Sequence, residues 1–203
     1  MIIRRAKPIV TMLSALIAGC TQSTNVRVDS ELPVALVEKL PLTVGVYYDD
    51  AIRDHSYTED TTERPNWVID SGDSQVALFD RVLASTFDRV IALENPQMAN
   101  SQLALDLVIA PSIREMQFAT PDETFFDFYE AWIQYDIDML RPDGSSIDAW
   151  KITAYGKSPK RRFVGRSDGL NSAIGLALRD VGAKLSTGMF RYPAIKQLLE
   201  KTR

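Results

Sequence analysis

The sequence predicts an α+β fold, in which a mainly antiparallel sheet has two helices packed on one face as a two-layer sandwich. Residues 129–139 alternate strictly between apolar and polar side chains, which is typical of a strand with one buried face. Segments 103–118 and 146–157 flank this strand and share its composition. Two other segments, 74–91 and 170–185, space their apolar residues by three and four, as helices covering a sheet do.

The first expected strand spans residues 40–48, which are β-branched and aromatic, and Pro41 suits only the start of a strand. The polar stretch 49–72 has no pattern of a regular element. We expect it to be the least ordered part of the domain, because few apolar groups offset the entropy of ordering it. Residues 67–69, Trp-Val-Ile, are expected to pin its end.

A helix is expected next, with Asp73 or Ser74 as its N-cap. Its apolar stripe consists of Val76, Phe79, Val82, Leu83, Phe87, Val90 and Ile91. Strand 103–118 follows, and Pro111 predicts an edge position or a bulge within it. The residues expected on one face of that strand are Leu103, Leu105, Leu107, Ile109 and Ile113.

Residues 129–139 and 146–157 are predicted to form an antiparallel hairpin around the turn Arg-Pro-Asp-Gly, 141–144. The expected inward side chains are Tyr129, Ala131, Ile133, Tyr135, Ile137 and Met139. The second helix has the stripe Leu170, Ile174, Ala177, Leu178, Val181 and Leu185. A last short helix is expected near Pro193, with Ile195, Leu198 and Leu199 on its apolar side.

The N-terminus has the layout of a secretory signal peptide. Residues 1–8 contain three basic groups and no acid, residues 9–17 are mostly apolar, and Ala18 and Gly19 are small. A membrane-spanning helix needs about 20 mostly apolar residues, and the polar stretch 21–25 interrupts the run before that length. We therefore expect this segment to be removed.

Cys20, the only cysteine, ends the sequence Ile17-Ala18-Gly19-Cys20. This tetrapeptide resembles the lipobox of bacterial lipoproteins, which directs lipid attachment to the thiol and cleavage just before it. The resemblance implies a multiply acylated, palmitate-bearing cysteine, and two or more chains give stable anchoring. Thr21 instead of Asp follows, which implies the outer membrane with the chain on its periplasmic face. The alternative is a chance cysteine in an ordinary signal peptide.

These expectations divide the chain into a signal peptide at 1–19, a lipidated tether at 20–39 and a single periplasmic domain at 40–203. Without residues 1–19 the chain has 20 basic and 27 acidic residues, a net charge of −7. An acidic body argues against a nucleic-acid partner. It also gives no general attraction to an anionic membrane, so membrane association would depend on the lipid anchor.

The order of elements behind a lipobox resembles that of small outer-membrane lipoproteins with a TolB-N-terminal-like fold, including YajG, the PqiC type of transporter-auxiliary lipoprotein and LpoB. The resemblance covers roughly residues 40–188. It implies a non-catalytic binding or accessory module of a cell-envelope assembly or transport system. It supplies no catalytic residue, and we expect no enzyme activity and no cofactor.

His55 is the only histidine, which excludes a His-rich zinc site. Its acidic neighbours, Asp49, Asp50, Asp54, Glu59 and Asp60, are of the type that hard cations prefer, but their spacing matches no binding loop. A solvated acidic loop is the preferred interpretation, and no metal site is predicted. The alternative function is a periplasmic hydrolase that uses Asp136, Asp138 and Asp148 on the exposed sheet face.

A basic cluster follows the hairpin: Lys157, Lys160, Arg161, Arg162 and Arg166. Arg side chains bind carboxylate or phosphate groups through two hydrogen bonds, so this cluster is a candidate site for an envelope protein or an anionic envelope polymer. The helix N-terminus near Asp168 adds partial positive charge. A merely solvated loop is the alternative.

Trp132 and Trp150 are expected on outward positions of adjacent strands, where large aromatic side chains mark an interface. The alternative interpretation is that both tryptophan side chains are buried under a helix or under the tether.

Overall fold

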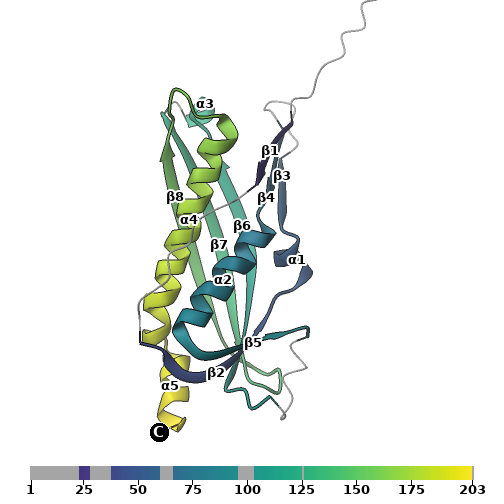
Figure 1. Ribbon diagram of the computed structural model, residues 1–203, viewed down its shortest axis with the longest axis vertical. Helices are drawn as coiled ribbons and strands as arrows, with labels where there is room; N and C mark the ends of the chain where they lie inside the picture. The colour runs from purple at the N-terminus through teal and green to yellow at the C-terminus, as the bar shows by residue number, and fades with distance from the viewer. Residues whose placement is uncertain (1–22, 28–37, 60–65, 96–102, 125, 203) are drawn as a thin grey trace, which may run out of the picture.

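The large sheet has five strands of mixed direction in the order β5-β2-β6-β7-β8 (Figure 1). The computed structural model describes residues 23–27, 38–59, 66–95, 103–124 and 126–202. The strands are β2 (Leu40–Tyr47), β5 (Phe87–Leu93), β6 (Leu107–Ala119), β7 (Phe128–Leu140) and β8 (Ser146–Pro159). Strand β2 runs parallel to β5 and β6, whereas β6, β7 and β8 are antiparallel.

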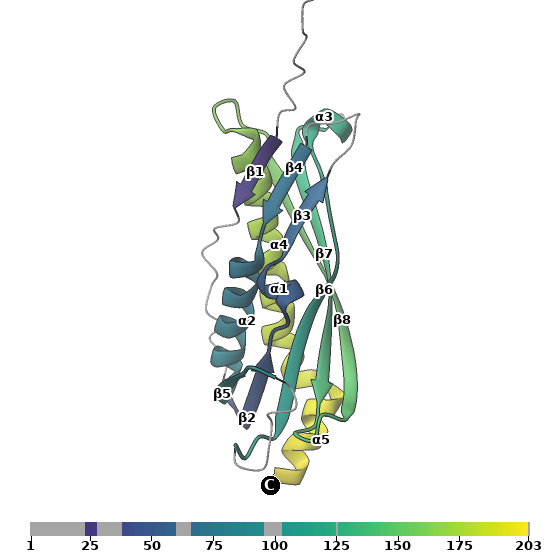
Figure 2. The ribbon, with the colours of Figure 1, turned by 90° about the vertical axis from the view of Figure 1, so that its right-hand side faces the viewer.

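Two helices, α2 (Gly72–Thr86) and α4 (Arg166–Gly188), cover one face of this sheet (Figures 1 and 2). The α+β prediction is therefore confirmed. All six residues of the predicted α4 stripe are fully buried in the core. A turn of 3₁₀ helix, η2 (Met189–Arg191), and helix α5 (Pro193–Thr202) follow α4, as the sequence predicted from Pro193 onward.

A second, three-stranded sheet was not predicted. Its strands are β1 (Ser23–Arg27), β4 (Asn66–Asp70) and β3 (Ser56–Glu59), in the order β1-β4-β3. The rings of Trp67 and Phe118 lie 5.7 Å apart, so this small sheet packs on the face of the large sheet that also carries the helices. The segment expected to form a tether thus includes one strand of this sheet.

The expectation that residues 49–72 contain no regular element is wrong over their described part, which contains α1 (Asp50–Arg53) in addition to β3 and β4. The expectation that this stretch is the least ordered part of the domain stays a prediction. Short strands and a four-residue helix lack the length that a pattern needs to be recognised. The expected pinning at 67–69 is confirmed, because Trp67 and Ile69 are buried.

Helix α2, the first helix that the sequence predicted, is shorter than expected. It ends at Thr86, and Phe87 has the extended dihedral angles that start β5. Phe87 is buried by the sheet, so its spacing from Leu83 matches a helical stripe by coincidence. The helix also begins two or three residues earlier than expected, with Ser71 at the N-cap position.

The hairpin of β7 and β8 is confirmed. All six predicted inward residues of β7 are buried, and Gly144 takes the positive φ of 83° that the turn requires. In β6, the register with β2 ends at Ile109 and a bulge lies after Ile113, which agrees with the local prediction from Pro111. Leu103 and Leu105 precede β6 and join a separate small cluster with Leu93, so their predicted place on the face of Leu107 is wrong.

The molecule has two distinct ends (Figures 1 and 2). The upper end in both views contains the start of β1, the short helix α3 (Pro121–Thr124) between β6 and β7, and the β8–α4 connection. The lower end contains the β7–β8 turn, η2 and α5. Helix α4 runs from the upper end to the lower one.

Candidate interaction surface

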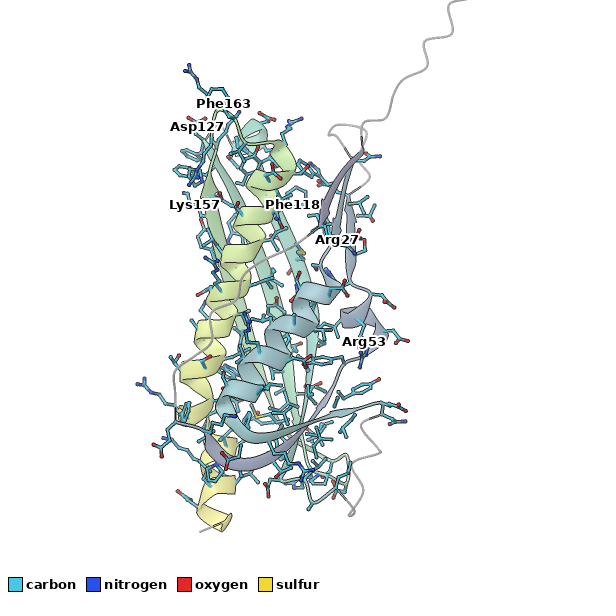
Figure 3. The ribbon with its side chains drawn as sticks, viewed as in Figure 1. Arg27, Arg53, Phe118, Asp127, Lys157 and Phe163 are labelled. Atoms are coloured by element: carbon cyan, nitrogen blue, oxygen red, sulfur yellow. The ribbon has the colours of Figure 1, made fainter. Side chains whose placement is uncertain are left out.

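The described residues of the upper end form what we call the tip surface. It consists of Asp122, Phe126, Asp127, Lys160, Arg161, Arg162, Phe163, Val164 and Arg166, from α3, the α3–β7 connection and the β8–α4 loop. Figure 3 shows Phe163 and Asp127 at this end, with Lys157 lower on β8. Four of the five predicted basic residues therefore belong to the tip surface.

Asp122 and Asp127 hold the two loops of the tip surface together. The backbone N–H of Lys160 donates to the carbonyl oxygen of Asp127 at 2.8 Å. The Asp122 carboxylate accepts a hydrogen bond from the Arg166 guanidinium and lies 3.6 Å from the Lys160 ammonium. The hydrogen bond from Arg166 lowers the pKa of Asp122 below its usual value. Lys160 and Arg166 are thus partly neutralised and serve mainly to fix the loop.

Arg161 and Arg162 differ from these two cations. Both are exposed, and within the part of the chain that the structure describes neither forms an ion pair. The backbone N–H of Val164 donates to the carbonyl oxygen of Arg161, which closes a turn. Phe163, at the outside of this turn, is 98% exposed.

Phe163 is the feature that sequence reasoning missed. Apolar neighbours are also exposed: Phe126 to 66% and Val164 to 40%. The available signal was an apolar pair, Phe163-Val164, inside a polar segment with neither helical nor strand periodicity, where no core position was expected. The tip surface therefore combines exposed apolar side chains with two guanidinium groups that have no ion-pair partner in the described part of the chain.

Lys157 belongs to a different surface, on the sheet face that the helices leave uncovered. Its ammonium lies 3.5 Å from the Glu130 carboxylate and 4.0 Å from the centre of the Phe128 ring. The Tyr155 hydroxyl donates to Glu130 at 2.5 Å, which raises the pKa of Tyr155 to about 12. The Trp132 and Tyr155 rings lie 5.3 Å apart, so Trp132 faces outward as predicted.

The predicted outward orientation of Trp150 is wrong. Trp150 pairs with the buried Ile137 and therefore points to the helix-covered face. Its ring stacks on Tyr192 at 5.0 Å and lies against Gly188, where a Cβ atom would approach the indole to 2.3 Å. The two tryptophans do not share a surface.

The three carboxylates of the hydrolase hypothesis also fail to share a face. Asp136 points outward and lies 3.2 Å from the Arg114 guanidinium. Asp148 pairs with the inward Met139 and hydrogen-bonds Tyr192; burial and this bond raise the pKa of the Tyr192 hydroxyl. The predicted grouping of Asp148 with Asp136 and Asp138 is therefore wrong, because the β7–β8 register places Asp148 on the opposite side.

His55 lies where β3 meets α2, and its Nδ1 is 2.8 Å from the Ser71 hydroxyl oxygen. Burial lowers the pKa of His55. Asp49 accepts a hydrogen bond from the Ile52 N–H and so caps α1. Among the described residues, no group of three or more His, Cys, Asp or Glu side chains is placed to share a metal ion. Asp60 lies outside the described residues.

Cys20 and the expected signal peptide also lie outside the described residues. In the part of the chain that is described, no helix combines the length and the hydropathy required to cross a bilayer.

The fold is shared with a solved structure. A crystal structure of a Xanthomonas campestris protein of the family DUF330 superposes with a TM-score of 0.54 at 13% identity, over 87% of this chain and 98% of that one. The PelC dodecamer of Paraburkholderia phytofirmans gives 0.36 at 13% identity, over 74% of this chain and 93% of that one. Lipoprotein GNA1162 of Neisseria meningitidis gives 0.31 at 10%, over 59% and 84%. What the first comparison shows is the α+β fold.

No family model matches the sequence. One curated protein, a 3D-(3,5/4)-trihydroxycyclohexane-1,2-dione hydrolase of Bacillus velezensis, is 36% identical over 75 residues. The match covers 37% of this chain and 12% of that enzyme, so the chain spans about an eighth of the length of the relative that it matches.

Proposed function

We propose that this chain is an outer-membrane lipoprotein, anchored through Cys20 on the periplasmic face, whose α+β domain is a non-catalytic binding module of a cell-envelope assembly or transport system. In this proposal residues 1–19 are a signal peptide that is removed on lipidation. The lipobox Ile17-Ala18-Gly19-Cys20 and the charged, then apolar, segment before it support the anchor.

The tip surface is the observation that carries the binding function. Arg161 and Arg162 form no ion pair with any described residue, and the loop that holds them is fixed by Asp122 and Asp127. A loop that is already held in place loses less conformational entropy when it binds a partner. The chemistry fits an anionic group on an envelope protein or an envelope polymer.

Binding is favoured over hydrolysis by the positions of the carboxylates. Asp136 is engaged by Arg114, and Asp148 lies on the other side of the sheet beside Tyr192. Two carboxylates that act together in hydrolysis must flank one bond. Asp136 and Asp148 do not face one site, and Asp136, which shares the outer face of β7 with Asp138, is already paired with Arg114.

The anchor is tested by Cys20→Ser in cells supplied with radioactive palmitate. We expect the label to be lost and the precursor to remain uncleaved at this site, while the neighbouring substitution Thr21→Ser keeps both labelling and cleavage. Thr21→Asp should keep the label but move the protein from the outer to the inner membrane fraction. A labelled Cys20→Ser protein would contradict the proposed anchor.

A further inference from the structure

The start of β1 lies at the same end of the molecule as the tip surface (Figures 1 and 2). Ser23 begins β1, and Cys20 precedes it by three residues. Three extended residues span at most about 11 Å. A lipid on Cys20 therefore keeps the tip end of the domain close to the bilayer.

We propose that the tip surface rests directly on the bilayer that holds the acylated Cys20, with Phe163 in the headgroup region and Arg161 and Arg162 on lipid phosphates. The inference depends on the proposed anchor, and it assigns the tip surface to lipid phosphates in place of the envelope protein or envelope polymer named above. An aromatic side chain beside cationic ones is the usual composition of an interfacial contact. Guanidinium groups match phosphate oxygens through paired hydrogen bonds.

The charges around the tip surface fit this partner. The tip surface has four cations, Lys160, Arg161, Arg162 and Arg166, and two carboxylates, Asp122 and Asp127. Asp122 engages Lys160 and Arg166, and among the described residues Arg161 and Arg162 form no ion pair. Beyond residues 1–19, however, the chain has a net charge of −7. An anionic bilayer would repel that body and attract its cationic tip, which orients the long axis away from the membrane.

The apolar groups favour lipid over an anionic polymer. Phe163 and Val164 stand at the outside of the loop, and Phe126 is exposed on the neighbouring connection. A polysaccharide or a phosphate polymer would satisfy the arginines and leave these side chains in water. The bilayer interface takes up both kinds of group, and the anchor keeps the effective concentration of that interface high.

The inference is tested on the full lipidated chain in vesicles. With Cys20 acylated, Val164→Cys supplies the only free thiol, which can carry an environment-sensitive fluorophore beside Phe163. The matched control is Gln197→Cys, at an exposed position of α5 on the opposite end. In phosphatidylglycerol vesicles we expect a blue shift and quenching by a lipid-borne quencher at residue 164, and neither effect at residue 197.

Charge reversal distinguishes an effect of the cations in the tip surface from an effect of the net charge of the whole chain. Arg161→Glu with Arg162→Glu, in the Val164→Cys chain, should abolish the blue shift. Arg191→Glu with Lys196→Glu changes the net charge equally at exposed positions of the lower end and should leave the shift intact. Phe163→Ala should reduce the quenching, and phosphatidylcholine vesicles should give a smaller shift than anionic ones.

Palmitate labelling of the same preparation distinguishes the possible failures. A labelled chain whose residue 164 stays in water in both kinds of vesicle would overturn the bilayer contact and leave the anchor standing. A shift that requires added periplasmic protein would overturn it in favour of a protein partner. An unlabelled chain would overturn the anchor and, with it, this inference.

Discussion

The two ends of the domain differ in how far an aromatic side chain is shielded from solvent. At the lower end, Trp150 is covered because the chain turns back after α4 and places Tyr192 on the indole. At the upper end the chain only turns between β8 and α4, and Phe163 remains bare. At the lower end, the segment that follows α4 shields the aromatic side chain from solvent. Among the described residues, no corresponding segment shields Phe163 at the tip.

Both ends of the domain carry exposed cations, whereas the exposed apolar side chains gather at the tip. Arg191 and Lys196 are exposed at the lower end, as Arg161 and Arg162 are at the tip. Among the described residues, the exposed large apolar side chains are Phe126, Tyr155, Phe163, Val164 and Leu176, and three of these five belong to the tip surface. Positive charge alone therefore does not distinguish the ends; its combination with apolar surface does.

The largest expected effect compares Trp150→Ala with Phe163→Ala. Removing the indole leaves a cavity against Tyr192 and Gly188, and we expect the free energy of unfolding to fall by about 3 kcal/mol. Removing the exposed Phe163 ring should change it by less than about 0.5 kcal/mol. Urea denaturation of the two variants measures both values, and equal losses would contradict the contrast between the ends.

A smaller effect is expected at the link between the tip loops. Asp122→Asn removes the partners of Lys160 and Arg166 and should cost no more than about 1 kcal/mol, because these side chains are half exposed. Asp127→Asn is the matched control, since Asp127 holds Lys160 through its backbone carbonyl.

The pH dependence of the Asp122 effect has a definite sign. The pKa of Asp122 is lowered in the folded protein, so its stabilisation is present above the usual value of 3.8 and is lost as the pH falls through the folded value. The difference in melting temperature between wild type and Asp122→Asn should therefore shrink in acid. A difference that grows below pH 3.8 would contradict the assignment.

The smallest expected effect lies between the two ends, at His55. Burial lowers its pKa, so the folded state holds the imidazole neutral. Its contribution is complete above the usual value of 6.5 and is lost as the pH falls through the lower, folded value. We expect His55→Gln to flatten the decline in melting temperature over this range. Because His55 is the only histidine, NMR titration gives its pKa directly, and a value at or above 6.5 would contradict the prediction.

Long patterned segments predicted their structure well. The 13 residues of β7 alternate, and the 23 residues of α4 repeat one stripe, so each gave enough periods to identify it. Strand β5 was hidden because Phe87, Val90 and Ile91 continue the spacing of α2 with no Gly or Pro between them. Strands β3 and β4 have four and five residues, too few for a pattern, and are stabilised by pairing with each other.

The face of the sheet to which the Trp150 side chain points could not be deduced from the two strands separately. The face of each β8 residue depends on its register with β7, and that register shifts between Met139 and Leu140. One irregular residue near the turn moves every later side chain to the other face. Trp132, on the strand whose inward face was known, was placed correctly, whereas Trp150 was not.

The candidate site was predicted in part. The basic residues were visible in the sequence, but Lys157 is outward on β8 and Asp122, which orders the loop, lies 44 positions before Arg166. Such a distant pair has no local signature. The exposure of Phe163 depends on the absence of a covering element, which only the tertiary arrangement shows.

Helix α4 has 23 residues and is therefore about 34 Å long, and it touches the sheet backbone where glycine leaves room. A Cβ atom at Gly156 would come within 1.9 Å of the Ala173 carbonyl oxygen, and one at Gly169 within 2.3 Å of the Tyr129 ring. A side chain at either glycine would therefore push the helix away from β7 and β8, so the close seating of α4 on the sheet depends on these two positions remaining glycine.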